Sequence, residues 1–216
     1  MAIALATQAV DWTVADIFDR FGPIALRRIR TDPPPGSATE QDVIDIHDRE
    51  KRCYELVDGV LVEKTMGLQE SFLTVVIIKI LGEYVSRHQL GFILGPDGMA
   101  RLAPGLVRIP DVSLVLWDQF PNRRVPRIPM LNFAPVLTVE VLSPSNTRQE
   151  MDRKLRDYFA AGVRLVWYVD PPARRIQTFT AVDQSNLLGD EETLTGGTVL
   201  PGFAVTLREL FAELEA

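Results

Sequence analysis

Two apolar runs near the middle of the chain constrain the fold more than any other feature of the sequence. APVLTVEVL begins at Ala134 and VRLVWYVD begins at Val163, and both are almost continuous in apolar residues. Such runs are typical of strands that are covered on both faces of a sheet. The segment 148–161 between them has a helical pattern, which a polar residue at 145–147 can cap and Gly162 can end. The order strand, helix, strand predicts a βαβ crossover.

The flanking segments supply further strands and helices. YELV and VLVEK surround Asp58-Gly59, a dipeptide favoured in tight turns, and therefore predict a β-hairpin. Further strands are expected in PDVSLVLW and in RRIQTFT, a small β unit in DEETLTGGTVLPGF, and a terminal helix in TLRELFAEL. A long helix is expected in GLQESFLTVVIIKILGEYVSRHQ, ended by Gly91. The apolar residues expected to place that helix on the sheet are Leu68, Phe72, Val75, Val76, Leu81 and Val85.

Strands and helices in this order predict an α/β domain with a central mixed β-sheet flanked by helices. We assign residues 46–216 to this domain and residues 1–45 to an N-terminal accessory segment. The segment begins with a helix in TVADIFDRF, capped by Asp11 or Thr13 and ended at Gly22-Pro23. TDPPPGSATE, at 31–40, indicates a linker or an extended surface arm.

Composition limits the cofactors and the cellular setting. The 216 residues, 46% of them hydrophobic and 24% charged, suffice for the core of one domain. One cysteine, Cys53, and two histidines exclude a cysteine-type zinc site, so a bound metal is expected to be hard and oxygen-ligated. The longest apolar stretch, 72–81, is interrupted by Lys79 and is shorter than the roughly 20 residues of a membrane span. We therefore predict a cytoplasmic protein without a membrane association.

The net charge of −6 weakens a nucleic-acid hypothesis without excluding it, because metal-dependent nucleases use several carboxylates to hold cations. Arginines occur in three groups: Arg27, Arg28 and Arg30; Arg123, Arg124 and Arg127; and Arg174 and Arg175. Solvated surface faces are the simpler interpretation of such groups.

Two carboxylates have unusual positions. Asp111 follows Pro110 at the start of an apolar strand, and Glu140 lies inside VLTVEVL, where a charge is costly unless it is paired or bound to a metal. Lys154 lies in the helix expected to pack back over that strand. The alternatives are a strand-end residue for Asp111, a solvent-facing edge-strand residue for Glu140 and a surface lysine for Lys154.

RIPDVSLVLW, APVLTVEVLSPSNTRQEMDRKLRDYFAAGVRLVWYVDP and the upstream YELVDGVLVE together resemble the Uma-two family of endonucleases. This family belongs to the PD-(D/E)XK restriction-endonuclease-like superfamily, so the resemblance, over roughly 50–210, implies a restriction-endonuclease-like core. It makes Pro110-Asp111 the PD of the superfamily motif and Glu140 the second acidic residue. The usual lysine position two residues later is Leu142 here, which makes Lys154 the candidate for a migrated lysine.

The resemblance implies a Mg²⁺-dependent nuclease that hydrolyses DNA, with Mn²⁺ as a substitute metal. The metal ligands would be Asp111, Glu140 and the Val141 carbonyl, and Glu55 would be a further acidic member of the site. Lys154 would stabilise the transition state electrostatically. A homodimer is expected from the same resemblance, because two strands require two sites.

Two other functions remain open. A nuclease-like module that binds nucleic acid or serves assembly, with the carboxylates as a remnant, would agree with the displaced lysine and the acidic composition. A metal-dependent hydrolase of a smaller phosphate ester is the third hypothesis. Glu70, at the start of the long helix, is a further acidic candidate, although the helix macrodipole alone favours a carboxylate there.

Overall fold

A central six-stranded sheet organises the computed structural model, which describes residues 12–120 and 122–214. Its strand order is β10-β9-β8-β7-β6-β3, and only β7 and β8 are parallel. The strands are β3 (Gly91–Leu94), β6 (Val112–Leu116), β7 (Leu137–Val141), β8 (Leu165–Asp170), β9 (Arg175–Ala181) and β10 (Gln184–Leu188). Helix α4 (Arg148–Ala160) connects β7 to β8, which confirms the predicted βαβ crossover and the mixed α/β sheet.

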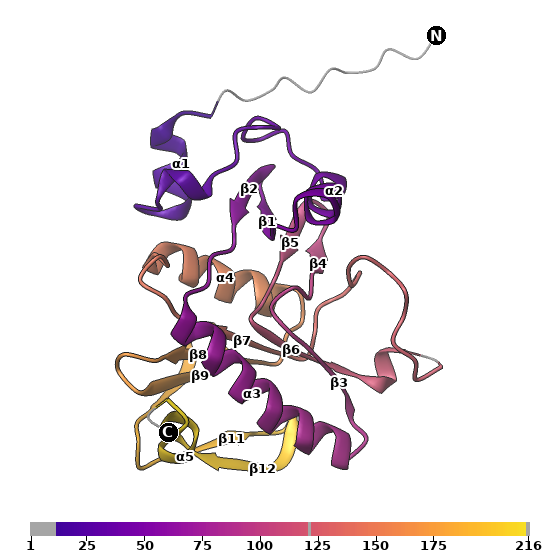
Figure 1. The fold of residues 1–216 in the computed structure, drawn as a ribbon, viewed down its shortest axis with the longest axis vertical. Coiled ribbons are helices and arrows are strands. Elements are labelled where there is room, and N and C mark those ends of the chain that lie inside the picture. The colour runs from indigo at the N-terminus through magenta and orange to yellow at the C-terminus, as the bar shows by residue number, and fades with distance from the viewer. Residues whose placement is uncertain (1–11, 121, 215–216) are drawn as a thin grey trace.

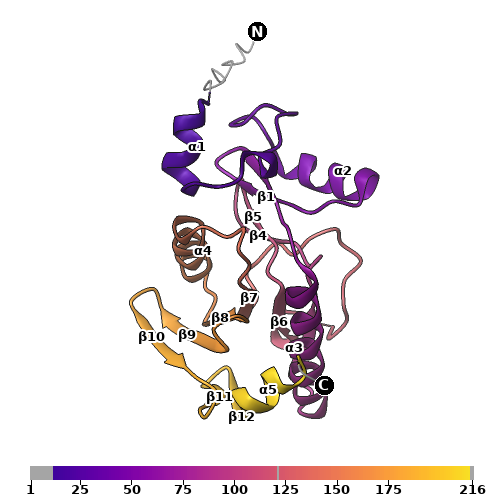
Figure 2. The same cartoon turned by 60° about the vertical axis from the view of Figure 1, so that its left-hand side comes forward.

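Helices cover both faces of this sheet, and Figure 2 shows α4 on one side and α3 on the other. The first face packs against α3 (Leu68–Arg87), α5 (Leu207–Ala212) and the hairpin of β11 (Thr193–Gly196) and β12 (Leu200–Thr206). The second face packs against α4, where Val166 and Tyr168 contact Met151 and Leu155. Because side chains alternate along a strand, every second residue of β7 therefore faces α4.

A second, four-stranded sheet was not anticipated from the sequence as a separate unit. Its order is β2-β1-β5-β4, and Figure 1 shows it above the central sheet, next to α1 and α2. The strands are β1 (Tyr54–Val57), β2 (Val60–Glu63), β4 (Ala100–Ala103) and β5 (Leu106–Arg108), of which β1 and β2 form the predicted hairpin. Residues 109–111 run directly from β5 in this sheet to β6 in the central one. The chain at Asp111 is therefore a junction between the two sheets.

The first part of the N-terminal segment packs against one face of the second sheet, on strands β1 and β2. Helix α1 (Val14–Phe21), capped by Thr13, places Ile17 and Phe21 against β1 and β2. Ile24 and Ile29, on either side of the short 3-10 helix η1 (Leu26–Arg28), belong to the same apolar cluster. In the proline-rich arm, the N–H groups of Gly36 and Ala38 both donate to the Gly59 carbonyl, so part of the arm is bound to the hairpin turn.

Helix α2 (Glu40–Glu50) begins directly after the arm, with Thr39 as its N-cap. This helix was not predicted from the sequence, and the proposed boundary at residue 45 falls inside it. Val43 and Ile46 of α2 pack with Tyr54 and Leu56 of β1. The helix therefore connects the two segments into which we divided the sequence.

Helix α3 corrects two predictions. Leu68, Phe72 and Val75 were expected to face the sheet, but they are 90%, 45% and 60% exposed. The buried residues of α3 are Leu73, Thr74, Val76, Ile77, Leu81 and Val85. The sequence is apolar on most sides of this helix, so periodicity alone left two possible buried stripes. Gly91 does not end the helix, which stops at Arg87; it begins β3, where a side chain would clash with the Val115 carbonyl.

A further short 3-10 helix, η2 (Trp117–Gln119), follows β6. No helix in the described ranges combines the length and the apolar character that a membrane span requires.

A buried ion pair joins the N-terminal segment to α4. Arg28 is 3% exposed, and its guanidinium donates to both carboxylate oxygens of Glu150 at 2.8 and 3.0 Å. It also donates to the carbonyls of Glu63 and Ser145 at 3.0 and 2.9 Å. The interpretation of its arginine group as a solvated face is therefore wrong for Arg28, because four acceptors from distant parts of the chain surround its side chain.

We expect Arg28→Ala to lower the free energy of unfolding by about 3–5 kcal/mol, because it leaves the Glu150 carboxylate buried without its cation. Urea unfolding monitored by circular dichroism would measure the change. Arg148→Ala is the matched control, since the Arg148–Asp152 pair is exposed and 3.7 Å long, and should change the value by less than about 0.5 kcal/mol. Equal effects of the two substitutions would contradict a structural role for the buried pair.

Candidate active site

Two carboxylates predicted from the sequence lie opposite each other on neighbouring strands. Val112 of β6 pairs with Val139 of β7 in antiparallel register, so the next position outward sets Asp111 opposite Glu140. Opposite residues of an antiparallel pair project from the same face of the sheet. Asp111 is held in place because its N–H donates to the Val139 carbonyl at 3.0 Å and its Oδ2 accepts from the Val141 N–H at 2.6 Å. Both carboxylates are at least 95% buried.

Helix α4 supplies the next two members of the site. Lys154 and Tyr158 are four residues apart, so they lie on one side of the helix, the side that packs on the sheet. The Lys154 Nζ lies 3.3 Å from each carboxylate oxygen of Glu140. The Tyr158 hydroxyl donates to Glu140 Oε1. The structure thus brings the lysine and the carboxylate together across the βαβ crossover, as the sequence analysis expected.

The second sheet contributes Glu55, which reaches the same lysine. Lys154 Nζ lies 3.0 Å from Glu55 Oε1, and that oxygen also accepts from the Ile109 N–H at 3.1 Å. The other oxygen of Glu55 accepts from Arg108 at 2.8 Å, and Arg108 in turn pairs with Asp157 of α4. Because Leu56 pairs with Val107, Glu55 and Arg108 lie opposite each other on β1 and β5. One ammonium therefore bridges a carboxylate from each sheet.

Lys64 is a member of the site that the sequence analysis missed. Its Nζ lies 2.8 Å from Asp111 Oδ1 and 2.7 Å from the Ile109 carbonyl. A signal was present, because only four of the 23 basic residues are lysines and Lys64 directly follows the apolar strand VLVE. Two of the four lysines lie at this one centre.

The buried centre has more negative than positive charge. It contains four carboxylates, Glu55, Asp111, Glu140 and Asp157, and three cations, Lys64, Arg108 and Lys154, so its net charge is −1 when all are ionised. Burial raises the pKa of Glu140 above its usual value, and the charges of Asp111 and Glu55 add to this effect although Lys154 opposes it. Burial would also raise the pKa of Glu55, but Lys154 and Arg108 outweigh it and lower that pKa. With all seven groups ionised, the centre is one positive charge short of balance.

The donor set fits a hard cation between Asp111 and Glu140. A carboxylate oxygen can accept more than one contact. Among the described residues, each of the two Asp111 oxygens has one hydrogen-bond or ion-pair partner, and so does Glu140 Oε2. Oxygen ligands are those that Mg²⁺ prefers. Within the part of the chain that the structure describes, no three His, Cys, Asp or Glu side chains are grouped to hold a metal. Two carboxylates, rather than three, would thus form the protein's side-chain ligands.

The other acidic candidates have different roles. Glu55 is engaged by Arg108, Ile109 and Lys154, so it positions the lysine. Glu70 lies in the first turn of α3, where its carbonyl accepts from the Thr74 hydroxyl, and within the described ranges its side chain forms no hydrogen bond or ion pair with the centre's residues. No such interaction ties Glu70 to the buried centre in the described ranges.

The surface near the site is hollowed around the loop that follows β7. A groove of about 820 Å³ is lined by Pro23, Ala25, Arg27, residues 144–149, Asp152 and Arg156. Ser143 and Ser145, in the predicted turn, hydrogen-bond to each other at 2.7 Å.

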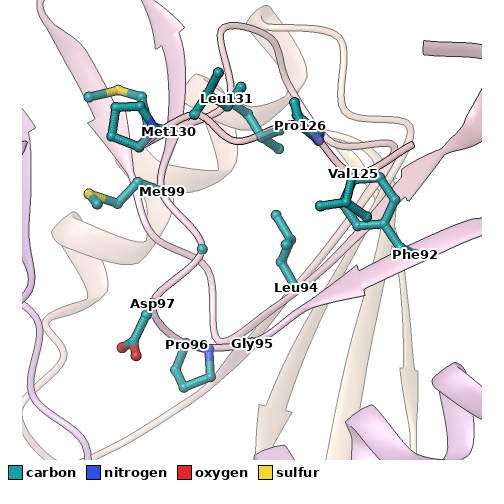
Figure 3. Close-up of a pocket in the computed structure, with 13 residues that line it drawn as sticks. Phe92, Leu94, Gly95, Pro96, Asp97, Met99, Val125, Pro126, Met130 and Leu131 are labelled. Atoms are coloured by element: carbon teal, nitrogen blue, oxygen red, sulfur yellow. The ribbon is translucent and has the colours of Figure 1, made fainter. Parts of the chain in front are cut away.

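A separate cavity of about 410 Å³, drawn in Figure 3, is lined mostly by apolar side chains such as Phe92, Leu94 and Met130. The Gly95–Asp97 turn at its edge lies beside Lys64, which contacts the Pro96 carbonyl at 3.3 Å.

Comparisons with known proteins agree with this architecture. A family model described as Uma2, putative restriction endonuclease, matches residues 40–208, and the chain belongs to this family. A solved structure described as a putative nuclease belonging to DUF820, from Anabaena variabilis, has the same fold, with a TM-score of 0.68. It is 15% identical in sequence, and the match covers 76% of this chain and 92% of that one. No curated protein matches the chain significantly. The predicted family and fold class are thereby confirmed.

Cys53 lies beside the site, since its carbonyl accepts from the Lys64 N–H at 2.9 Å, but its thiol is poorly suited to act as a nucleophile. Burial, together with the neighbouring Asp97 carboxylate, raises the pKa of the Cys53 thiol to about 11. The thiolate is the reactive form, so little of it exists near neutral pH.

We expect iodoacetamide to alkylate Cys53 at pH 8 about 10²-fold more slowly than a cysteine peptide, and the rate to keep rising with pH beyond pH 10. Mass spectrometry of time points would measure it. Asp97→Asn removes a carboxylate that raises the pKa, so this variant should react faster than the wild type at pH 8. A rate that levels off by pH 9 would contradict the raised pKa.

Proposed function

We propose that this protein is a cytoplasmic Mg²⁺-dependent endonuclease that hydrolyses phosphodiester bonds of DNA. The observation that carries the proposal is the pairing of Asp111 with Glu140 on adjacent strands, with Lys154 3.3 Å from Glu140, in a chain of the Uma2 family. Mn²⁺ is the expected substitute metal. A homodimer is part of the proposal, because cutting both strands of a duplex requires two sites.

Asp111, Glu140 and the Val141 carbonyl would hold the metal. When bound, Mg²⁺ offsets charge on the phosphate and helps to orient the attacking water. The carboxylates of the buried centre support this assignment, since burial, with the charges of Asp111 and Glu55, raises the pKa of Glu140, and a bound cation would favour its ionised form. The Val141 N–H already contacts Asp111, so its main chain is fixed beside the carboxylate.

Lys154 supplies a permanent positive charge in this proposal. Burial favours the neutral amine, but Glu140 and Glu55 outweigh it and raise the pKa of Lys154, so the ammonium form persists. A protonated lysine can stabilise charge that develops on a phosphate, whereas it cannot act as a general base. Glu55 and Tyr158 are positioning residues, since they fix Lys154 and Glu140 respectively.

Unpaired arginines support nucleic acid as the ligand. Arg27 and Arg156 line the groove beside the β7–α4 loop, and within the described ranges neither has an ion-pair partner. Arg148 lines the same groove and has only the long, exposed contact with Asp152. In a chain with a net charge of −6, free guanidinium groups along one groove are suited to a polyanion such as a phosphate backbone.

A nuclease-like module without catalytic activity is the second candidate. It is favoured by the finding that Lys64 and Lys154 already form ion pairs with the carboxylates Asp111, Glu140 and Glu55 without a metal. Such a module would bind nucleic acid in the groove but would gain no stability from Mg²⁺ or Mn²⁺.

We expect Glu140→Gln to abolish Mn²⁺ binding in calorimetry and to reduce DNA cleavage by at least about 10²-fold, because it removes a charged ligand while keeping the side chain's shape. Circular dichroism should show a folded protein. Glu83→Gln, the same substitution at an exposed carboxylate on α3, is the matched control and should leave both measurements unchanged. Full cleavage by Glu140→Gln would refute the assignment, and a wild type that neither binds Mn²⁺ nor cleaves DNA or RNA would favour the inactive module.

The triple variant Arg27→Ala/Arg148→Ala/Arg156→Ala is expected to bind a DNA duplex more weakly, and to reduce the slope of log affinity against log salt by roughly 2–3. Fluorescence anisotropy at several salt concentrations, with EDTA present, would measure this independently of cleavage. The control is Arg49→Ala/Arg87→Ala/Arg208→Ala, three arginines that already have acidic partners. Equal slopes for the two variants would remove the groove from the proposed interface.

A further inference from the structure

Lys64 is surrounded by three oxygen atoms that converge on its ammonium group. These are Asp111 Oδ1 at 2.8 Å, the Ile109 carbonyl at 2.7 Å and the Pro96 carbonyl at 3.3 Å. An ammonium has three N–H donors, so each has an acceptor. The Lys64 side chain is only 10% exposed, and it is thus held in one place by segments that meet at the junction of the two sheets.

One carboxylate and two main-chain carbonyls are also the kind of ligands that a hard metal ion takes. The Lys64 ammonium therefore occupies a position with the chemistry of a cation site, on an oxygen of the same Asp111 that would hold the metal. Lys154 is placed differently, since its contacts are with Glu55 and Glu140. Each of the two proposed ligand carboxylates thus has its own ammonium.

We propose that Lys64 takes the place of a second metal ion, so that the centre binds a single divalent cation. The inference rests on the proposed function. With all seven groups ionised, the centre's net charge of −1 becomes +1 when one divalent cation is bound, and a phosphodiester group with one negative charge then balances it. A second divalent cation would leave a buried excess of two positive charges, which a low-dielectric site disfavours.

The first experiment measures how many Mn²⁺ ions the wild-type protein binds, by calorimetry and by electron paramagnetic resonance, where two neighbouring ions give a spin-coupled spectrum. We expect one ion per chain and no spin coupling. Two ions per chain that both depend on Asp111 would overturn the role of Lys64 and leave the proposed function standing. No Mn²⁺ binding at all would overturn both.

The second experiment removes the positive charge of Lys64 and keeps the length of its side chain. Lys64→Met should tighten Mn²⁺ binding about tenfold, because a repelling ammonium is gone, and should slow cleavage about 10²-fold, because its charge no longer acts on the phosphate. Lys64→Arg, which keeps the charge, should retain the wild-type Mn²⁺ affinity. Lys79→Met, an exposed lysine on α3, is the control. If Lys64 only held Asp111 in place, Lys64→Met would instead bind Mn²⁺ more weakly than the wild type. Weaker Mn²⁺ binding, or cleavage at the wild-type rate, would overturn the inference.

Discussion

The contact of Lys154 with Glu55 and Glu140 joins the parts of the molecule on which the site depends. Glu55 belongs to the second sheet, Glu140 to the central sheet, and the lysine to the helix of the βαβ crossover. All three are nearly fully buried, so removing any one leaves charge in a low-dielectric environment, where it is costly. The same ion pairs that hold the two sheets together therefore also fix the groups suited to phosphate chemistry.

The N-terminal segment supports this arrangement from the outside. Arg28 contacts the main chain of Glu63, which directly precedes Lys64, and that of Ser145 in the loop after β7, and it pairs with Glu150 in the first turn of α4. A single buried guanidinium thus fixes the ends of the elements that carry both lysines. We infer that the segment helps to preorganise the centre, although the sequence suggested that it was an accessory.

Much of the site was predictable because its members lie within one local pattern. Glu140 stood out as a charge in an apolar strand, and Lys154 follows in the helix that a βαβ crossover returns over that strand, so proximity followed from topology. Lys64 and Arg108 were not predicted, because their partners are distant in sequence and each residue alone resembles an ordinary surface cation. The buried stripe of α3 was predicted only in part, since an evenly apolar helix does not indicate which side meets the sheet.

The sequence by itself determined strands β1, β2, β6–β9, β11 and β12, most of the helices with their caps and the mixed α/β class, because alternation, capping residues and turn dipeptides act over a few residues. The family followed from the resemblance of longer motifs, whereas strands β3, β4, β5 and β10 were not predicted. The tertiary structure alone decided that β1, β2, β4 and β5 form a second sheet, that the chain at Asp111 links the two sheets, and that two lysines share one acidic centre. These features depend on register between strands distant in the chain and on the desolvation of charges. Both are set by long-range packing, and neither leaves a periodic signal in the sequence.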